Sequence, residues 1–193
     1  MDPSSTEALA ANGVGSPMTR AADRVAAERA VADLLLALGR DVGAEPLSHT
    51  PGRVVTSLIE LLTPVEVTAT TFPNGEGYCG PVVIREIPFH SLCEHHLMPF
   101  RGVAHVGYIP RDRIVGISTL PRIVEHFSRD LQMQERLTVN VADWLERELD
   151  PVGVGVILEA EQLCMSLRGV GTPTTITITS AFRGTMTRAD LER

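Results

Sequence analysis

A long helical pattern runs from Met133 to Leu149, and it restricts the possible folds more than any other segment. Its apolar residues recur at helical spacing and would form one buried stripe, made of Leu137, Val141, Trp144, Leu145 and Leu149. Asp150-Pro151 ends the pattern, because proline cannot continue a helix. A helix with one apolar face needs a second layer to cover that face.

Short β-type runs, broken by glycine and proline, lie on both sides of this helix and can supply that layer. They cover residues 65–72, 82–89, 102–109 and 114–118 before it, and 152–159 and 174–182 after it. Residues 121–127 form another helical pattern, and residues 164–170 are expected to be extended. Strands, then helices, then strands indicate an α+β fold with antiparallel pairing.

The N-terminal part is expected to be helical after a flexible tail. Residues 1–19 are rich in Ser, Ala, Gly and Pro and are interpreted as that tail. A first helix is expected over residues 21–38, with Gly39 as its C-terminal stop, and a second begins at Thr50-Pro51 and ends before Pro64. At 193 residues, the remainder, residues 20–193, is expected to form a single domain.

Charge and composition exclude several classes of protein. A formal net charge of −7 argues against broad binding to nucleic acid or to anionic membranes. No apolar run approaches the roughly 20 residues needed to span a bilayer, and the N-terminus does not resemble a secretory signal, so a cytoplasmic location is the expectation. A reducing compartment would keep the three cysteines as thiols, available for metal binding or chemistry.

The segment Cys93-Glu94-His95-His96 is the densest cluster of reactive side chains. Cys93 and His96, three residues apart, can share one metal ion, and zinc accepts both ligand types. A catalytic zinc needs a third protein ligand, for which Cys164 is the candidate, and such a set leaves one tetrahedral position open. His95, adjacent to His96 in the sequence, is not expected to face the same metal, which leaves it available for proton transfer.

Simpler interpretations stay open for these cysteines. A Cys-x-x-His spacing alone is a weak signal, and Cys164 could be a buried structural thiol. Cys79, in a glycine-rich turn without a nearby histidine, fits that role better. A zinc deaminase is excluded because the Pro-Cys-x-x-Cys half of its signature is missing.

Other residues could bind a nucleotide. The carboxylate of Glu135, beside the amide of Gln134, could accept the N1–H and exocyclic amine of guanine, although a solvated helix start explains the pair equally well. Three arginines have the planar fork that suits phosphate oxygens, but each could be an ordinary surface residue: Arg53, Arg122 and Arg168.

Taken together, several segments in register closely resemble the GTP cyclohydrolase I family. They are residues 89–96, 104–110, 115–118, 122–124, 134–138, Cys164-Met165, 168–170 and 179–182. The resemblance extends from about Thr50 to Gly184. It implies a tunnelling fold (T-fold), an antiparallel sheet with flanking helices, assembled into a homodecamer with active sites between subunits.

The resemblance also implies roles for individual residues. Cys93, His96 and Cys164 would hold Zn²⁺, while His95 would transfer protons. Glu135, assisted by Gln134, would bind guanine. Ribose and triphosphate would be surrounded by Ser118, Arg53, Arg122 and Arg168. The implied reaction adds water at C8 of GTP, opens the imidazole ring, releases formate and closes a pterin ring to give 7,8-dihydroneopterin triphosphate, a step of pterin and folate biosynthesis.

The sequence departs from the family pattern near the implied site. Gln162 stands where the family usually has a catalytic histidine, Thr119 where it has a lysine, and Gly171-Thr172 where Arg-Lys often follows. Glutamine can orient water but cannot exchange a proton near neutral pH. Three outcomes are therefore open. The protein runs the full reaction, or it is a divergent enzyme that stops at a formamidopyrimidine or deformylated pyrimidine nucleotide or uses another purine nucleotide, or it is an inactive nucleotide-binding homologue.

Overall fold

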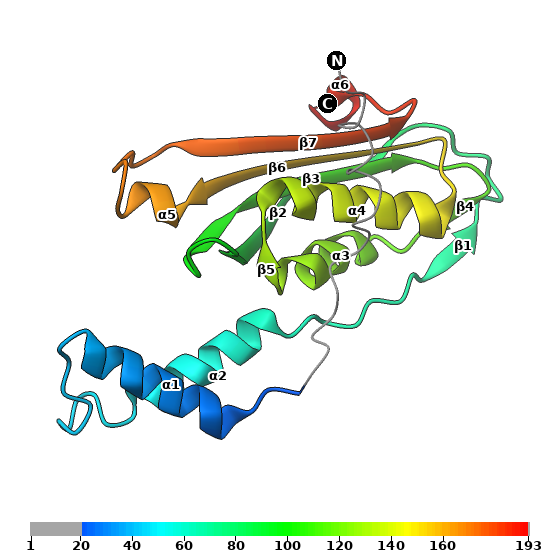
Figure 1. Cartoon of the computed structure of the whole chain (residues 1–193). Coiled ribbons are helices and arrows are strands. Elements are labelled where there is room, and N and C mark those ends of the chain that lie inside the picture. Colours follow the sequence, from blue (N-terminus) through cyan, green and yellow to red (C-terminus); the bar gives the residue numbers. More distant parts are fainter. Residues whose placement is uncertain (1–20, 193) are drawn as a thin grey trace, which may run out of the picture.

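A five-stranded sheet forms the centre of the molecule, in the order β5-β2-β3-β6-β7 (Figure 1). The computed structural model describes residues 21–192, so the expected tail of residues 1–19 lies outside the described part. The strands are β2 (Val82–Cys93), β3 (Pro99–Ile109), β5 (Leu131–Gln132), β6 (Gly153–Gln162) and β7 (Ile176–Gly184). All neighbours are antiparallel except β2 and β5, which pair in parallel over two residues.

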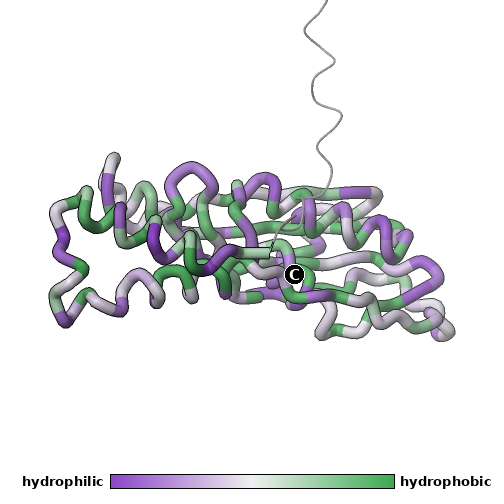
Figure 2. Tube along the Cα trace, turned by 60° about the horizontal axis from the view of Figure 1, so that its bottom comes forward, coloured by the Kyte–Doolittle hydropathy of each residue, from purple (hydrophilic) through white to green (hydrophobic). Residues whose placement is uncertain are grey.

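Two helices cover one face of this sheet, α3 (Thr119–Ser128) and α4 (Gln134–Leu149) (Figure 1). The stripe expected on the long helix is buried, with Leu137, Val141 and Leu145 at 0% exposure. These side chains pack on sheet residues such as Val106 and Leu158. Figure 2 shows hydrophobic stretches along the packed elements, while many outlying turns are polar. The α+β class and the helix-flanked antiparallel sheet of the T-fold are confirmed.

The other face of the sheet is covered at one end by the short helix α6 (Arg188–Glu192). Leu191 and Met186 pack there on Ile157, whose neighbours along β6 face the opposite layer because side chains alternate across a strand. The sequence patterns did not predict this helix.

Two helices at the N-terminus form a hairpin beside the sheet domain, α1 (Arg24–Ala37) and α2 (Thr50–Leu62) (Figure 1). Gly39 follows α1 with a φ of +74°, the left-handed conformation that commonly ends a helix, as expected. No residue of α1 is buried. Among the described residues, no helix is both long and apolar enough to cross a membrane.

Three expected extended segments are shorter or absent: residues 65–72, 114–118 and 164–170. Residues 65–70 are irregular, and only β1 (Thr71–Pro73) pairs, with the three-residue β4 (Arg113–Val115). The extended segment expected at residues 164–170 is wrong, because Leu163–Ser166 forms one helical turn, α5. Gln162, the last residue of β6, pairs with Phe100, and β3 begins only one residue earlier, at Pro99. Residues after Gln162 therefore have almost no length of β3 with which to pair.

Replacing Leu145 by alanine should lower the free energy of unfolding by about 2–5 kcal/mol, since it opens a cavity beneath a fully buried side chain. Urea unfolding followed by circular dichroism measures the change. Val139→Ala, on the same helix but 40% exposed, should cost less than about 1 kcal/mol. Equal losses in the two variants would contradict the assigned orientation of α4.

Candidate metal centre and nucleotide site

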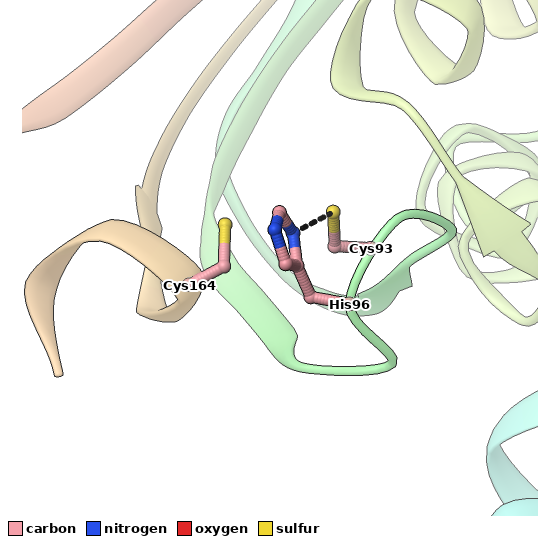
Figure 3. Close-up of side chains that lie close together, drawn as sticks. All are labelled: Cys93, His96 and Cys164. Atoms are coloured by element: carbon pink, nitrogen blue, oxygen red, sulfur yellow. Dashed lines mark hydrogen bonds between the residues drawn. The ribbon is translucent and has the colours of Figure 1, made fainter. Parts of the chain in front are cut away.

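Cys93, His96 and Cys164 lie together at one end of the sheet, where β2 and β6 end (Figure 3). One ligand atom from each residue lies within 4.8 Å of the other two. Cys93 is buried, Cys164 is half-buried and His96 is exposed, so the group is open on one side. Cys164 lies about 70 positions after Cys93 and His96 in the sequence, and the fold brings the three side chains close together.

The turn between β2 and β3 orients the first two members of this group. Its closing hydrogen bonds run from the Cys93 amide to the Met98 carbonyl (2.8 Å) and from the Leu97 amide to the Cys93 carbonyl (2.9 Å). Leu97 adopts a φ of +53°, which allows the chain to reverse within this short turn. As a result, the Cys93 and His96 side chains project to the same side.

Cys164 is supplied by α5, the single helical turn that follows β6. Because β6 pairs with β3 along its length, the end of β6 lies next to the turn that carries His96. The hydrogen bond from the Leu167 amide to the Leu163 carbonyl (3.1 Å) closes the turn. Cys164 therefore faces Cys93 and His96 across the end of the sheet (Figure 3).

The spacing of these donors suits a tetrahedral metal ion. Zinc bound to sulfur and nitrogen would place the two ligand atoms about 3.6 Å apart, and the Cys93 Sγ to His96 Nδ1 distance is 3.7 Å. Burial raises the pKa of the Cys164 thiol, and the neighbouring Cys93 raises that pKa further, against a smaller opposing effect of the Arg168 charge. A cation bound beside Cys164 would offset this raised pKa, because it stabilises the thiolate form.

His95 lies beside this group without belonging to it. Its Nδ1 is 3.9 Å from Cys93 Sγ, and its ring stands at 79° to that of His96. The His95 side chain is 60% exposed, so it can reach a bound ligand from the solvent side. Its Nε2 faces Glu94, at 3.6 Å from a carboxylate oxygen. The sequence patterns gave Glu94 no role.

The guanine-binding candidates begin helix α4. Glu135 lies in the first helical turn and is exposed, whereas Gln134 is 3% exposed. The Gln134 amide donates to the carbonyls of Leu158 (3.1 Å) and Thr177 (2.9 Å), and its oxygen accepts from Gln162 Nε2 (2.8 Å). Gln134 thus joins α4 to β6 and β7, and Glu135 is the member of the pair that is open to a ligand.

The candidate phosphate-binding residues are dispersed in the single chain. Arg168 is close enough to Cys164 for its charge to lower that thiol's pKa. Arg122 lines a separate cavity of about 920 Å³ against β2 and β3, and Arg53 lies in the α1–α2 hairpin, in a cavity of about 540 Å³. Ser118 is exposed at the start of α3, while Thr119 is buried. None of the metal-ligand candidates lines either cavity.

The sequence of this chain is similar to those of several known proteins. The model of the family described as GTP cyclohydrolase I matches residues 27–193. A protein named GTP cyclohydrolase 1 from Mycolicibacterium gilvum is 47% identical over 169 residues, covering 84% of this chain and 83% of the relative. Proteins of the same name from Mycobacterium tuberculosis and Sulfurihydrogenibium sp. are 46% and 45% identical, covering 88% and 84% of this chain and 86% and 87% of those relatives.

A solved structure also resembles the fold. It is the archaeosine synthase QueF-Like in its apo form, with a TM-score of 0.46 and 18% sequence identity, covering 56% of this chain and 97% of that chain.

Proposed function

Because the chain belongs to the GTP cyclohydrolase I family, we propose that it is a zinc-dependent hydrolase that opens the imidazole ring of GTP at C8. The proposed reaction releases formate and forms 7,8-dihydroneopterin triphosphate. The observation that carries the proposal is the convergence of Cys93, His96 and Cys164 within 4.8 Å, on an open side of the molecule. Two sulfurs and one imidazole favour zinc over magnesium or calcium, which prefer oxygen ligands.

Each residue near the group has a proposed part in the chemistry. When bound by Cys93, His96 and Cys164, zinc supplies a Lewis acid that activates water for attack at C8. His95, beside the ligand group and exposed, moves the protons that ring opening requires. Glu135 binds the N1–H and exocyclic amine of guanine through its two carboxylate oxygens. Gln134 supports Glu135 by fixing the start of α4 to the sheet.

We place the complete active site between subunits of a homodecamer. Arg53 and Arg122 lie in cavities that the metal-ligand candidates do not line, so one chain does not gather all the proposed phosphate ligands. In this proposal Ser118, Arg122 and Arg53 approach the triphosphate from a neighbouring subunit, and Arg168 approaches it from the subunit that holds the metal. Large apolar side chains exposed on β7, on α1 and at the C-cap of α1 also favour an assembly: Ile176, Ile178, Val25, Leu34 and Leu38.

The experiment that tests this proposal is incubation of zinc-replete protein with GTP, followed by ultraviolet absorbance, formate release and mass spectrometry of the product. A pterin triphosphate together with one equivalent of formate is expected. If guanine nucleotides bind by calorimetry but neither absorbance nor formate changes, the protein is an inactive homologue and the enzymatic proposal is wrong.

A second candidate is a reaction that stops before the pterin, and the environment of Gln162 favours it. The Gln162 side-chain amide donates to Gln134 Oε1 at 2.8 Å, so Gln162 is held in place as a hydrogen-bonding group. An amide does not titrate near neutral pH, so Gln162 cannot act as a general acid or base. The product would then be a formamidopyrimidine, which retains the C8 carbon, or a deformylated pyrimidine nucleotide. Mass spectrometry separates these products from a pterin.

Replacing Gln162 by histidine should raise the rate of pterin formation roughly 10²-fold if the wild-type reaction stops early, because a general acid/base typically contributes 10²-fold or more to a step. Chromatography of the products over time provides the measurement. Gln162→Leu, which removes the hydrogen bond to Gln134 without adding an imidazole, is the control and should not restore the pterin. Complete conversion to pterin by the wild-type protein would exclude the truncated reaction.

A further inference from the structure

An ion pair ties helix α4 to the turn that carries two of the proposed metal ligands, residues 93–96. Glu94 lies in this ligand turn, directly after Cys93, and its side chain is 28% exposed. Its Oε2 accepts from Arg136 Nη2 at 2.5 Å, and Arg136 lies in the first turn of α4, directly after Glu135. The ion pair therefore joins the segment that holds proposed metal ligands to the segment that holds the proposed guanine ligand.

Arg136 is itself fixed by two further acceptors. Its Nε donates to Gln132 Oε1 at 2.9 Å, and its Nη2 also donates to the Leu131 carbonyl at 2.7 Å. A guanidinium is planar and its donors point in fixed directions, so three acceptors around it leave little freedom to turn. The position of the Glu94 carboxylate is therefore set by β5 and the start of α4.

Gln132 connects this arrangement to the core. It is 1% exposed, and its Nε2 donates to the Phe127 carbonyl near the end of α3 at 2.9 Å, so its Oε1 is held toward Arg136. Its backbone carbonyl accepts from the Glu94 amide at 3.1 Å, next to the two-residue pairing of β5 with β2. Both the backbone and the side chain of Glu94 are thus held, directly or through Arg136, by one buried residue.

The rest of the ligand turn lies at the surface. His95 and His96 are exposed, as is Leu97 directly after them, at 57%. Exposed side chains contribute little packing, so they cannot fix the turn against the sheet. The place of the turn relative to α4 consequently depends on the hydrogen bonds of Glu94 and on the backbone bonds that close the turn at Cys93.

We propose that Arg136 is a positioning residue, which acts through Glu94 to hold the metal-ligand group and Glu135 at a fixed separation. This inference rests on the proposed function, because the separation matters when one guanine base contacts both. Guanine is rigid, so its C8 reaches the metal-ligand group only if Glu135 holds the opposite edge of the base at a matching distance. A displacement of about 1 Å can lower a rate roughly 10²-fold. Arg136 touches neither metal nor substrate in this proposal.

Three variants separate the ion pair from general stability. Arg136→Met removes the guanidinium, while Glu94→Ala releases the turn and leaves Arg136 its other two hydrogen bonds. Arg183→Met is the matched control. Arg183 is 31% exposed, against 34% for Arg136, and it donates to Asp143 of α4 at 2.7 Å. Its ion pair joins β7 to the same helix, near the opposite end of the sheet from the metal-ligand group.

The first readout is the zinc affinity of the full-length protein, measured by competition with a chromophoric chelator. Arg136→Met and Glu94→Ala should each raise the Kd for zinc by roughly 10-fold or more, because a released turn has to be ordered when the ion binds. The double variant should bind no more weakly than the weaker single variant, since both changes remove one contact. Arg183→Met should bind zinc as the wild type does.

Wild-type zinc affinity in both single variants, or losses that multiply in the double variant, would overturn the proposal. This readout needs no turnover. If the wild type binds zinc but does not act on GTP, and the variants bind zinc more weakly as expected, only the proposed function fails.

The second readout is the split between kcat and KM for GTP at saturating zinc. In Arg136→Met, kcat should fall by roughly 10²-fold while KM changes little, because Glu135 still binds the base but C8 is displaced from the metal-ligand group. Arg136→Lys keeps a cation for Glu94 without the planar fork and should recover part of the rate. A lower urea midpoint together with wild-type kcat in Arg136→Met would mean that Arg136 only stabilises the fold, and would overturn the positioning role.

Discussion

Replacing Cys93 by alanine is expected to remove bound zinc and GTP turnover together. The change leaves only His96 and Cys164 from the ligand group, and two protein ligands do not hold a catalytic zinc. Without the Lewis acid, several kcal/mol of transition-state stabilisation are lost, so formate release should fall by roughly 10³-fold or more. Metal analysis of the purified protein and a formate assay measure the two effects.

Two further variants separate metal loss from misfolding. Cys93 is 7% exposed and packs in the core, so His96→Ala, at an exposed ligand position, should give the same losses with less effect on stability. Cys79→Ala removes an exposed thiol that is not part of the group and should keep both zinc and activity. Unchanged zinc content in Cys93→Ala and His96→Ala would show that the ligand assignment is wrong.

Replacing Glu135 by glutamine should lower kcat/KM for GTP by roughly 10³-fold. The carboxylate offers two acceptors to the two guanine donors, whereas the glutamine amide turns a donor toward one of them. Losing a charge-assisted hydrogen bond and leaving a donor unpaired costs about 4 kcal/mol, which corresponds to that factor. Steady-state assays over a range of GTP concentrations provide the measurement.

Inosine triphosphate, which lacks the exocyclic amine, makes this test specific for base recognition. The wild type should discriminate strongly against inosine triphosphate. Glu135→Gln should lose most of that discrimination, because the glutamine NH₂ group opposes the exocyclic amine of GTP, and inosine triphosphate has no such donor. Glu148→Gln, near the other end of α4, should leave both substrates unaffected. An unchanged ratio of GTP to inosine triphosphate in Glu135→Gln would place guanine recognition elsewhere.

The parts of the fold that were predictable from sequence are those with a local periodic signal. Helix α4 follows directly from its apolar stripe, and Leu137, Val141 and Leu145 are all fully buried. Helix α6 is only five residues long, and Leu191 is buried because the second face of the sheet lies beneath it. The burial of Leu191 depends on tertiary packing, so it could not be predicted from the local sequence.

The same distinction applies to strands. Residues 65–70 have a strand-like composition, yet β4 is only three residues long and pairs with β1 alone. The length of a strand depends on the length of the strand that pairs with it, and the local sequence of residues 65–70 does not determine where β4 ends. At the end of β6, the chain turns into α5 because β3 extends only one residue beyond the last paired position.

The candidate site was predictable in its components, and the contacts among them were not. Cys93 and His96 are close in sequence, but Cys164 joins them only through the adjacency of β6 and β3. Glu94 could have been noticed as an acid beside a histidine, yet its anchor, Arg136, is 42 residues away. Gln134 was expected to assist Glu135 in binding guanine, and the hydrogen bonds of its amide to Leu158, Thr177 and Gln162 depend on tertiary contacts that the sequence does not show.

Because the proposed metal ligands come from two segments that are far apart in the sequence, they are translated at different times. Cys93 and His96 leave the ribosome about 70 residues before Cys164, which at 5–20 residues per second is an interval of roughly 4–14 s. During that interval the nascent chain holds only two members of the proposed ligand group, and two protein ligands do not hold a catalytic zinc. Capture of the proposed zinc ion would therefore have to wait until β6 has been translated and has docked on β3, which would make it one of the last steps in maturation of the subunit.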